Sequence, residues 1–283
     1  MGAEDPSRAS PAEPHGPLLE AAWLRAHLRD DDVRVIDFRW YLKGRNGHDE
    51  YVRGHIPGAV FVDLEAVTGA EGGGRHPLPT REQFEAEMRR AGVSSSTRVV
   101  VYDDAGASVA ARLWFLLGYF GHRAQAVLDG GIGAWGGPLE TAVPRIDPGD
   151  FRAAAPDEGR VLHFESVRDL RDVPLIDARA GERYRGETEP IDPKAGHVPG
   201  ALNAPYTENV GADGRMKSRE ELRRRYAELG ADRGAVFYCG SGVNATQHLL
   251  AMEVAGLPNA RLYAGSWSDW SNRDLPVATG PEP

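Results

Sequence analysis

The only cysteine of this chain opens a short loop whose composition suits a nucleophile site, Cys239-Gly240-Ser241-Gly242-Val243-Asn244. The loop follows an apolar run that ends at Tyr238, typical of a buried strand, and precedes a segment, 245–252, that reads as helical. Two glycines allow a tight curl, in which backbone N–H groups of the loop and of the first helical turn can point at an anion. A cysteine thiolate held there would be stabilised.

Several kinds of chemistry are open to this cysteine. A free cysteine is usually a small buried residue, and the loop alone leaves that alternative about as strong as a nucleophile. A phosphatase loop needs an arginine after five intervening residues to clamp phosphate, but Ala245 stands there. Because the chain has one thiol, an internal disulfide, a Cys-rich zinc site and a peroxidase or exchange cycle with a resolving cysteine are disfavoured.

The chain contains one internal repeat, which predicts two tandem domains of the same fold. Five segments recur in the same order, with 35–39, 54–59, 80–83, 99–102 and 127–131 matching 175–179, 196–201, 218–221, 235–238 and 262–266. We therefore expect an N-terminal domain at 18–144 and a C-terminal domain at 161–279. Residues 145–160 between them are rich in Pro, Asp, Ala and Gly, which is typical of a linker.

Each copy alternates short apolar runs with amphipathic segments. The runs that predict buried strands include 33–38, 98–102 and 126–128. Capping boxes mark two helix starts, at Thr80 with Gln83 and at Ser218 with Glu221, and the helices are expected to end at Gly92 and Gly230. Strands that alternate with helices predict an α/β fold, with a mostly parallel sheet and helices on both faces.

The two copies differ at the loop that could do chemistry. Where the second copy has Cys239, the first has Asp103, so one domain could be active and the other structural. Other polar residues recur in both copies, namely His55 with His197 and Asp37 with Asp177. Because they are shared with the copy that lacks the cysteine, they indicate a role in the fold, such as a buried turn hydrogen bond, rather than in catalysis.

Composition narrows the possible partners and locations. The chain has 283 residues, with 33 Lys and Arg against 42 Asp and Glu, and this net charge of −9 argues against a general nucleic-acid surface. No apolar run approaches the roughly 20 residues that span a bilayer. Residues 1–17 are polar and lack the apolar stretch of a secretory signal, so we expect a short disordered tail and a cytoplasmic protein.

Together these motifs resemble the tandem rhodanese-domain sulfurtransferases, from about Leu19 to Val277. The resemblance is carried by segment 37–40, the two Gly-His-(Ile/Val)-Pro-Gly-Ala motifs, 128–131, 177–179, 239–243, 265–267 and Trp270. It implies two rhodanese-like domains, of which the first is inactive and the second carries sulfur as a persulfide on Cys239. The Cys-Gly-Ser-Gly-Val loop is similar to the 3-mercaptopyruvate branch, because the thiosulfate branch usually has basic residues just after the cysteine.

The resemblance also implies catalytic residues. The proton relay of the 3-mercaptopyruvate branch maps onto Ser241, His76 and Glu65, together with the nucleophile Cys239. The family has Asp where this chain has Glu65, which is one methylene longer but can also orient an imidazole. Without the resemblance, His76 reads as an exposed loop histidine.

Substrate binding maps onto a second set of residues, Arg183 with Arg112, and the loop residues Gly240, Gly242, Val243 and Asn244. A guanidinium suits a carboxylate because it donates two parallel hydrogen bonds, although most arginines are simple surface charges. The family's second carboxylate-binding arginine falls here at Ile191 or Asp192, and Lys194 nearby could replace it.

We therefore expect a sulfurtransferase that moves a sulfane sulfur from 3-mercaptopyruvate, through a Cys239 persulfide, to an acceptor. The acceptor would be cyanide or a thiol, such as thioredoxin or a small thiol, and no metal, organic cofactor, nucleic acid or membrane partner is expected. Two alternatives stay open. One is a thiosulfate:cyanide sulfurtransferase with the same nucleophile, and the other is a non-catalytic module that binds sulfur or docks a partner.

Overall fold

The computed structural model describes residues 16–283, so the tail expected at 1–17 lies, up to residue 15, outside the described residues. The first half of the chain forms one sheet from β1 (Leu18–Leu19), β2 (Val33–Asp37), β3 (Val60–Phe61), β4 (Arg98–Tyr102) and β5 (Gln125–Leu128). The second half forms another sheet from β6 (Val161–Leu162), β7 (Leu175–Asp177), β8 (Leu202–Asn203), β9 (Ala235–Tyr238) and β10 (Ala260–Tyr263).

The two sheets have the same topology. Their strand orders are β1-β5-β4-β2-β3 and β6-β10-β9-β7-β8, and every strand pairing in both is parallel. Each strand of the first sheet therefore has a counterpart in the second at the same place. This equivalence confirms the repeat that the sequence predicts, and it aligns β4 with β9, the strands that precede Asp103 and Cys239.

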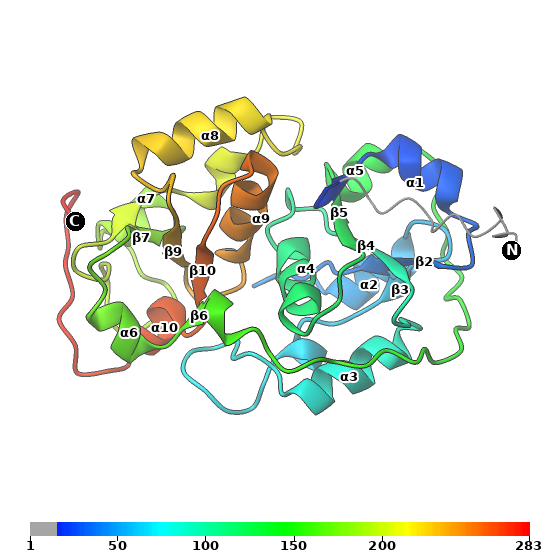
Figure 1. Ribbon diagram of the computed structural model, residues 1–283, viewed down its shortest axis with the longest axis horizontal. Helices are drawn as coiled ribbons and strands as arrows, with labels where there is room; N and C mark the ends of the chain where they lie inside the picture. Colours follow the sequence, from blue (N-terminus) through cyan, green and yellow to red (C-terminus); the bar gives the residue numbers. More distant parts are fainter. Residues whose placement is uncertain (1–15) are drawn as a thin grey trace, which may run out of the picture.

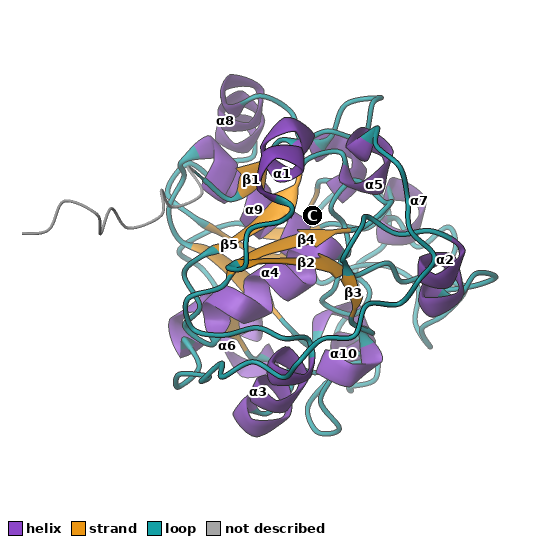
Figure 2. Ribbon diagram, turned by 90° about the vertical axis from the view of Figure 1, so that its right-hand side faces the viewer, coloured by secondary structure: helices purple, strands orange, loops and turns teal. Residues whose placement is uncertain are grey.

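Helices cover both faces of the sheets. Those of the first half are α1 (Ala21–His27), α2 (Gly47–Arg53), α3 (Arg81–Arg90), α4 (Ala110–Tyr119) and α5 (Gly131–Trp135). Those of the second half are α6 (Phe164–Arg168), α7 (Gly181–Tyr184), α8 (Arg219–Glu228), α9 (Thr246–Ala255) and α10 (Ser266–Trp270). In Figure 2, α1 and α5 lie on one side of the first sheet, and α3 and α4 lie on the other.

The side chains of β4 show why both faces must be covered. Val99 and Val101 pack into the core that contains α3 and α4, whereas Val100 and Tyr102 pack into the core beside α1 and α5. A strand that is buried on both faces reads as a continuous apolar run, which is the pattern found at 98–102. The α/β fold with helices on both faces is therefore confirmed.

The two halves meet through α4 and α9, which lie side by side in the middle of the molecule (Figure 1). Their apolar side chains belong to one continuous core that extends across both halves. Each of these helices begins directly after the loop that follows β4 or β9. Packing α4 against α9 therefore brings the Asp103 loop and the Cys239 loop to the same interface.

The helix ends follow the predicted signals with one exception. At α8 both halves of the capping box are present, since Ser218 accepts from the Glu221 N–H and the Glu221 carboxylate accepts from the Ser218 N–H. At α3 the Thr80 hydroxyl accepts from the Gln83 N–H, but the Gln83 side chain does not return the bond. Its amide instead donates to the carbonyls of Ala66 and Thr68, in and just after the short 3-10 helix Glu65–Val67, which an amide can do and a carboxylate cannot.

The polar residues shared by both copies form matching buried contacts. Arg39 donates to both oxygens of Asp37 and to the Gly54 carbonyl, and Arg179 does the same with Asp177 and Gly196. His55 and His197 are buried, and in each the ring nitrogen Nδ1 lies 2.8 Å from a backbone carbonyl oxygen. These contacts confirm the predicted role of the repeated Asp and His residues in the fold. Within residues 16–283, no helix combines the length and the apolar character needed to cross a membrane.

Asp37→Asn should destabilise the protein strongly. Asp37 is fully buried and Arg39 nearly so, and the amide would leave the buried guanidinium without its counter-charge, at a cost of about 3–5 kcal/mol. Urea unfolding followed by circular dichroism measures the loss. Asp169→Asn, in an exposed ion pair with Arg168, is the matched control and should leave the unfolding midpoint unchanged. An Asp37→Asn midpoint equal to that of wild type would contradict the prediction.

Candidate active site

A cavity of about 480 Å³ lies between the two halves, beyond the carboxyl ends of β2, β4, β7 and β9. This is where open α/β sheets bind their ligands. Its lining comes from both halves and consists of Trp40, Tyr41, Leu42, Lys43, Arg75, Ala105, Ser108, Val109, Ala178, Arg179, Ala180, Arg183, Ile191, Tyr206, Cys239, Gly240, Ser241 and Asn244. The predicted nucleophile therefore opens onto a space that both domains build.

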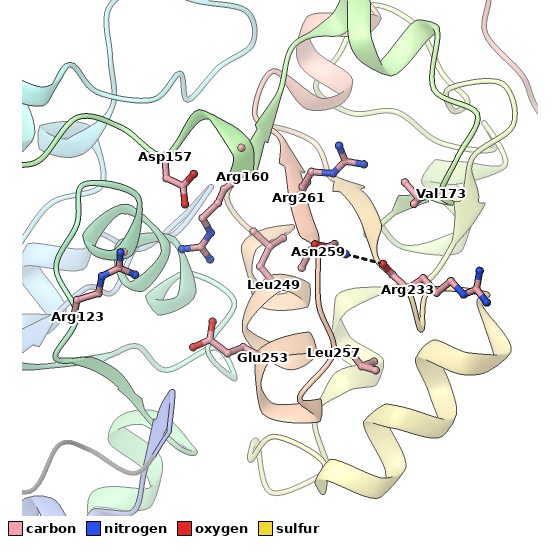
Figure 3. Close-up of a pocket in the computed structure, with 13 residues that line it drawn as sticks. Arg123, Asp157, Arg160, Val173, Arg233, Leu249, Glu253, Leu257, Asn259 and Arg261 are labelled. Atoms are coloured by element: carbon pink, nitrogen blue, oxygen red, sulfur yellow. Dashed lines mark hydrogen bonds between the residues drawn. The ribbon is translucent and has the colours of Figure 1, made fainter.

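A larger cavity, of about 760 Å³, lies elsewhere on the interface between the halves (Figure 3). Arginines and acids face it together, among them Arg160, Asp157 and Glu253. Among residues 16–283, no cysteine, serine or histidine lines it. Because no described residue that lines this larger cavity supplies a thiol or hydroxyl nucleophile, we take the Cys239 cavity as the candidate active site.

Cys239 is the first residue after β9 and is held from several sides. Its backbone N–H donates to Ser266 Oγ at 3.2 Å, and its carbonyl accepts from the Trp267 N–H at 3.0 Å, so the start of α10 fixes its main chain. The side chain is only 2% exposed, and its Sγ accepts from the Gly242 N–H at 3.2 Å. The loop curls so tightly that a Cβ on Gly242, where φ is +81°, would lie 2.4 Å from the Ala264 carbonyl oxygen.

The first domain shows what this loop shape binds. Asp103 is buried at the position equivalent to Cys239, and four backbone N–H groups donate to its carboxylate at 2.9–3.0 Å, those of Ala105, Ala107, Val109 and Ala110. Burial raises the pKa of Asp103, and these four hydrogen bonds oppose that shift. The loop between strand and helix is thus a cradle of N–H donors, filled in this copy by the protein's own carboxylate.

The cradle recurs around Cys239. The two loops have equal length, because α4 begins seven residues after Asp103 and α9 begins seven residues after Cys239. The N–H groups equivalent to three of the four Asp103 donors belong to Ser241, Val243 and Ala245, and they have no acceptor among residues 16–283. Buried N–H groups rarely stay without a partner. An anion held beside Cys239 would supply the acceptor that these donors need.

The three residues of the predicted relay come together across the domain interface. His76, from the first half, has Nδ1 2.8 Å from Ser241 Oγ in the second half, and its Nε2 lies 3.7 Å from Glu65 Oε1. Glu65 is exposed, whereas His76 is only 6% exposed. The alternative of an exposed loop histidine is therefore wrong, since tertiary packing covers this side chain.

The surroundings of His76 favour its neutral form. Burial, together with the positive charges of Arg112 and Arg75, lowers the pKa of His76 to about 4. The ring also packs edge-on against Trp40, with the two ring centroids 5.2 Å apart. A neutral imidazole whose Nε2–H faces the Glu65 carboxylate leaves Nδ1 free to accept the Ser241 hydroxyl proton.

The predicted substrate-binding residues lie in different places. Arg183 lines the cavity and donates to both carboxylate oxygens of Glu189. Arg112 is fully buried and does not line the cavity. Its guanidinium donates to the carbonyls of Gly242, His76 and Pro77, with the shortest of these bonds at 2.9 Å. This position suits the support of the relay and the cysteine loop, and the substrate contact expected of Arg112 stays a prediction.

The other predicted residues of the cysteine loop lie in or near the cavity, whereas Lys194 lies outside its lining. Gly240 lines the cavity, and Asn244 donates to the Ser108 carbonyl across the interface at 3.4 Å. Val243 is buried and does not line the cavity. The Lys194 ammonium donates to the carbonyls of Arg273 and Leu275, outside the cavity lining, so the idea that it replaces a second substrate-binding arginine does not fit its position.

The sequence analysis left several cavity residues unassigned to the site, among them Trp40, Arg75 and Tyr206. Burial and the nearby Cys239 raise the pKa of Tyr206. Arg75 directly precedes His76, and this adjacency was the one available signal that it faces the same site. Among residues 16–283, no group of three or more His, Cys, Asp or Glu side chains is placed to hold a metal ion.

Comparisons with known proteins agree with this geometry. The Rhodanese-like domain family matches residues 20–137 and 164–273. A probable 3-mercaptopyruvate sulfurtransferase of Pseudomonas aeruginosa is 42% identical over 93% of this chain and 98% of its own. SseB of Mycobacterium tuberculosis, provisionally named a thiosulfate sulfurtransferase, is 39% identical over 93% of this chain and 97% of its own. The crystal structure of SseA, a 3-mercaptopyruvate sulfotransferase from Escherichia coli, superposes with a TM-score of 0.80, at 35% identity, over 89% of this chain and 99% of that one.

The His76 imidazole should titrate far below an ordinary histidine. Its native pKa is about 4 against an ordinary 6.5, so the unfolded chain binds more protons between these values. The free energy of unfolding should therefore fall as the pH decreases from 6.5 towards 4, and buried His248, with a pKa lowered to about 3, acts in the same direction. Titration of the histidine ring signals by NMR, assigned with His76→Asn, measures the midpoint. A His76 midpoint near 6.5 would show that the ring is more solvated than the structure indicates.

Proposed function

Because this chain belongs to the rhodanese family, with a rhodanese-like domain in each half, we propose that it is a 3-mercaptopyruvate sulfurtransferase with Cys239 as its nucleophile. The observation that carries the proposal is the pair of equivalent loops. In the first domain four N–H groups bind a carboxylate, and in the second the same loop surrounds the only thiol of the chain. A negatively charged sulfur atom is a hydrogen-bond acceptor that suits the N–H donors of such a loop.

The reaction uses this loop in its first half. The Cys239 thiolate attacks the sulfur of 3-mercaptopyruvate, and an S–S bond forms while the carbon–sulfur bond breaks. The electron pair of the broken bond stays on carbon as the enolate of pyruvate, and the proton of the donor thiol moves to that carbon. The products are pyruvate and a Cys239 persulfide, whose negative outer sulfur faces the N–H groups of the cradle.

Ser241, His76 and Glu65 move the proton in this scheme. The neutral His76 accepts the Ser241 hydroxyl proton, so Ser241 can relay a proton between the donor thiol and the enolate carbon. Glu65 keeps the Nε2–H of His76 oriented from the solvent side. In the second half of the reaction, an acceptor thiolate or cyanide takes the outer sulfur and regenerates the Cys239 thiolate.

The acceptor we propose is a thiol, such as thioredoxin or a small thiol, with cyanide as a substitute. The Cys239 cavity opens between the domains, and its lining includes Tyr41, Leu42 and Lys43, of which Leu42 is an exposed apolar side chain. A persulfide is consumed by thiols, so we also propose a reducing compartment, the cytoplasm, as the place where the enzyme works.

The enzyme should gain one sulfur atom from its donor. Because the chain has a single thiol, any persulfide must lie on Cys239, and intact mass spectrometry should show an increase by the mass of one sulfur after incubation with 3-mercaptopyruvate. Cys239→Ser should show no increase. Steady-state kcat/KM should favour 3-mercaptopyruvate over thiosulfate by about tenfold or more. A preference for thiosulfate would reassign the donor, and a wild type that gains sulfur from neither would leave a non-catalytic module.

Ser241→Ala should lower kcat by roughly a hundredfold, because the relay loses the hydroxyl that faces His76. His76→Asn should have a similar effect. Since the two residues act as one unit, the double variant should be no slower than the worse single variant. The exposed Ser166→Ala is the matched control and should keep the wild-type kcat. A Ser241→Ala enzyme with unchanged kcat, or fully multiplicative losses in the double variant, would contradict the relay.

A further inference from the structure

The cavity of about 760 Å³ at the domain interface, here called the arginine cavity, is lined by four arginines (Figure 3). Each of them lies at the beginning of a strand. Arg123 and Arg233 come two residues before β5 and β9, Arg160 comes directly before β6, and Arg261 lies in the first half of β10. Because the Cys239 loop follows the carboxyl end of β9, the arginine cavity lies at the opposite end of the strands and is a separate site.

The protein itself provides no acceptor for these four guanidinium groups. Among residues 16–283, none of the four side chains donates a hydrogen bond or forms an ion pair, and Nε of Arg261 is buried in addition. The arginines that line the Cys239 cavity are different, because each is paired with an acid, namely Arg75, Arg179 and Arg183. A buried N–H donor without an acceptor is costly, which favours a ligand that brings anionic oxygens to the arginine cavity.

Arg160 is the clearest case of such a group. It is half-buried, and its guanidinium carbon lies 5.0 Å from the centroid of the Phe115 ring. Gly118 leaves room for it, since a Cβ there would lie 2.9 Å from Arg160 Nη1. Burial lowers the pKa of Arg160, the acids of the cavity oppose that shift, and the positive charge of nearby Arg123 adds to it. Two like charges are thus held near each other, and an anion between them would stabilise both.

The arginine cavity carries an excess of positive charge. Its lining contains four arginines and two acids, Asp157 and Glu253, so two positive charges remain, although the whole chain has a net charge of −9. This local excess matches a ligand with two or more negative charges. The volume of the cavity lies in the range of about 300–1,000 Å³ that is usual for small-molecule sites.

The positive charges are spread along the cavity. In Figure 3, Arg123 and Arg160 lie on one side of Leu249, whereas Arg233 and Arg261 lie on the other. A row of guanidinium groups suits a chain of anionic groups better than one small ion. Phosphate groups fit best, because guanidinium matches their oxygens with parallel hydrogen bonds and because consecutive phosphates each carry a charge, without the backbone that separates the carboxylates of an acidic peptide.

We propose that the arginine cavity binds a small ligand with a chain of two or more phosphate groups, which a nucleoside diphosphate or triphosphate and an inorganic polyphosphate share. Arg123 and Arg160 bind one end of the chain, and the apolar side chains of Leu249 and Leu257 can contact a nucleoside. The lining comes from the first domain, from the linker at 157–160 and from the second domain. The ligand therefore binds the docked pair of domains, and its binding goes beyond the proposed function and does not depend on sulfur transfer.

Titration calorimetry with inorganic tripolyphosphate, pyrophosphate, ADP and adenosine tests this site. Tripolyphosphate should bind, with an affinity that falls as the KCl concentration rises, because salt screens the charges, and adenosine should not bind. ADP that binds more tightly than pyrophosphate would identify a nucleotide as the ligand, and equal affinities would identify the phosphate chain alone. A tripolyphosphate that fails to bind at low salt would overturn the proposal, and so would tighter binding of a glutamate peptide of equal charge.

Variants of the cavity locate the bound anion. Arg160→Gln should weaken tripolyphosphate binding about tenfold or more, and Arg160→Lys should weaken it less, since an ammonium keeps the charge but not the planar fork. Glu253→Gln should tighten binding about threefold or more, because it removes a carboxylate that faces the anion, and a damaged fold cannot produce this gain. Arg29→Gln is the matched control, an exposed arginine outside the cavity lining, and should leave the affinity unchanged.

Two variants of the Cys239 cavity separate this site from the active site. Arg183→Gln and Cys239→Ser should both bind tripolyphosphate as tightly as wild type does, whether or not the protein forms a persulfide. A loss of affinity in Arg183→Gln with none in Arg160→Gln would place the anion in the Cys239 cavity and overturn the proposal. Unchanged affinity in both Arg160→Gln and Glu253→Gln would overturn it as well.

Discussion

The hydrogen bonds between backbone N–H groups and one buried anion are the interaction on which this structure depends. A loop that leaves a buried strand and enters a helix concentrates its N–H donors on one point, and those donors need an acceptor. In the first domain the acceptor is permanent, because the Asp103 carboxylate receives four of them. In the second domain Cys239 takes the same place, and its Sγ accepts from the Gly242 N–H. The same loop shape thus binds a carboxylate in one copy and surrounds the thiol in the other.

The second consequence of the fold is that neither domain completes the site alone. The helices that follow the two loops pack against each other, so the loops face one another across a shared cavity. Cys239 and Ser241 come from one half, whereas His76, Glu65 and Arg75 come from the other. Arg112 makes this junction rigid, since its buried guanidinium bonds carbonyls on both sides. The first domain, which has Asp103 where the second has Cys239, therefore supplies one wall of the shared cavity.

Much of this arrangement could be predicted from the sequence, because the signals are local or repeated. The apolar runs and the order of the repeats determine two parallel sheets, and glycines beside Cys239 indicate a curled loop. The Ser218 capping box is a contact over three residues and was predicted fully. The Gln83 half of the other box was wrong, since the carbonyls of Ala66 and Thr68, brought close only by folding, compete for its amide. A hydrogen bond predicted from a local sequence pattern forms unless folding brings a competing partner to the same side chain.

The electrostatics of the cavity depend on such tertiary partners. For that reason the ion pairs of the cavity could not be predicted from the sequence. Position 192 carries an acid where the resemblance leads us to expect a second substrate-binding arginine. From the sequence alone, this replacement reads as the loss of one contact to the substrate carboxylate. In the structure the acid holds Arg75, which reaches over from the first domain to Gly240. The guanidinium of Arg75 and the carboxylate of Asp192 lie on opposite sides of the domain interface. No sequence motif contains both residues, so their pairing could not be predicted. The positive charge near the nucleophile is therefore a property of the assembled pair of domains, and the chain can keep it only as long as the two domains stay docked.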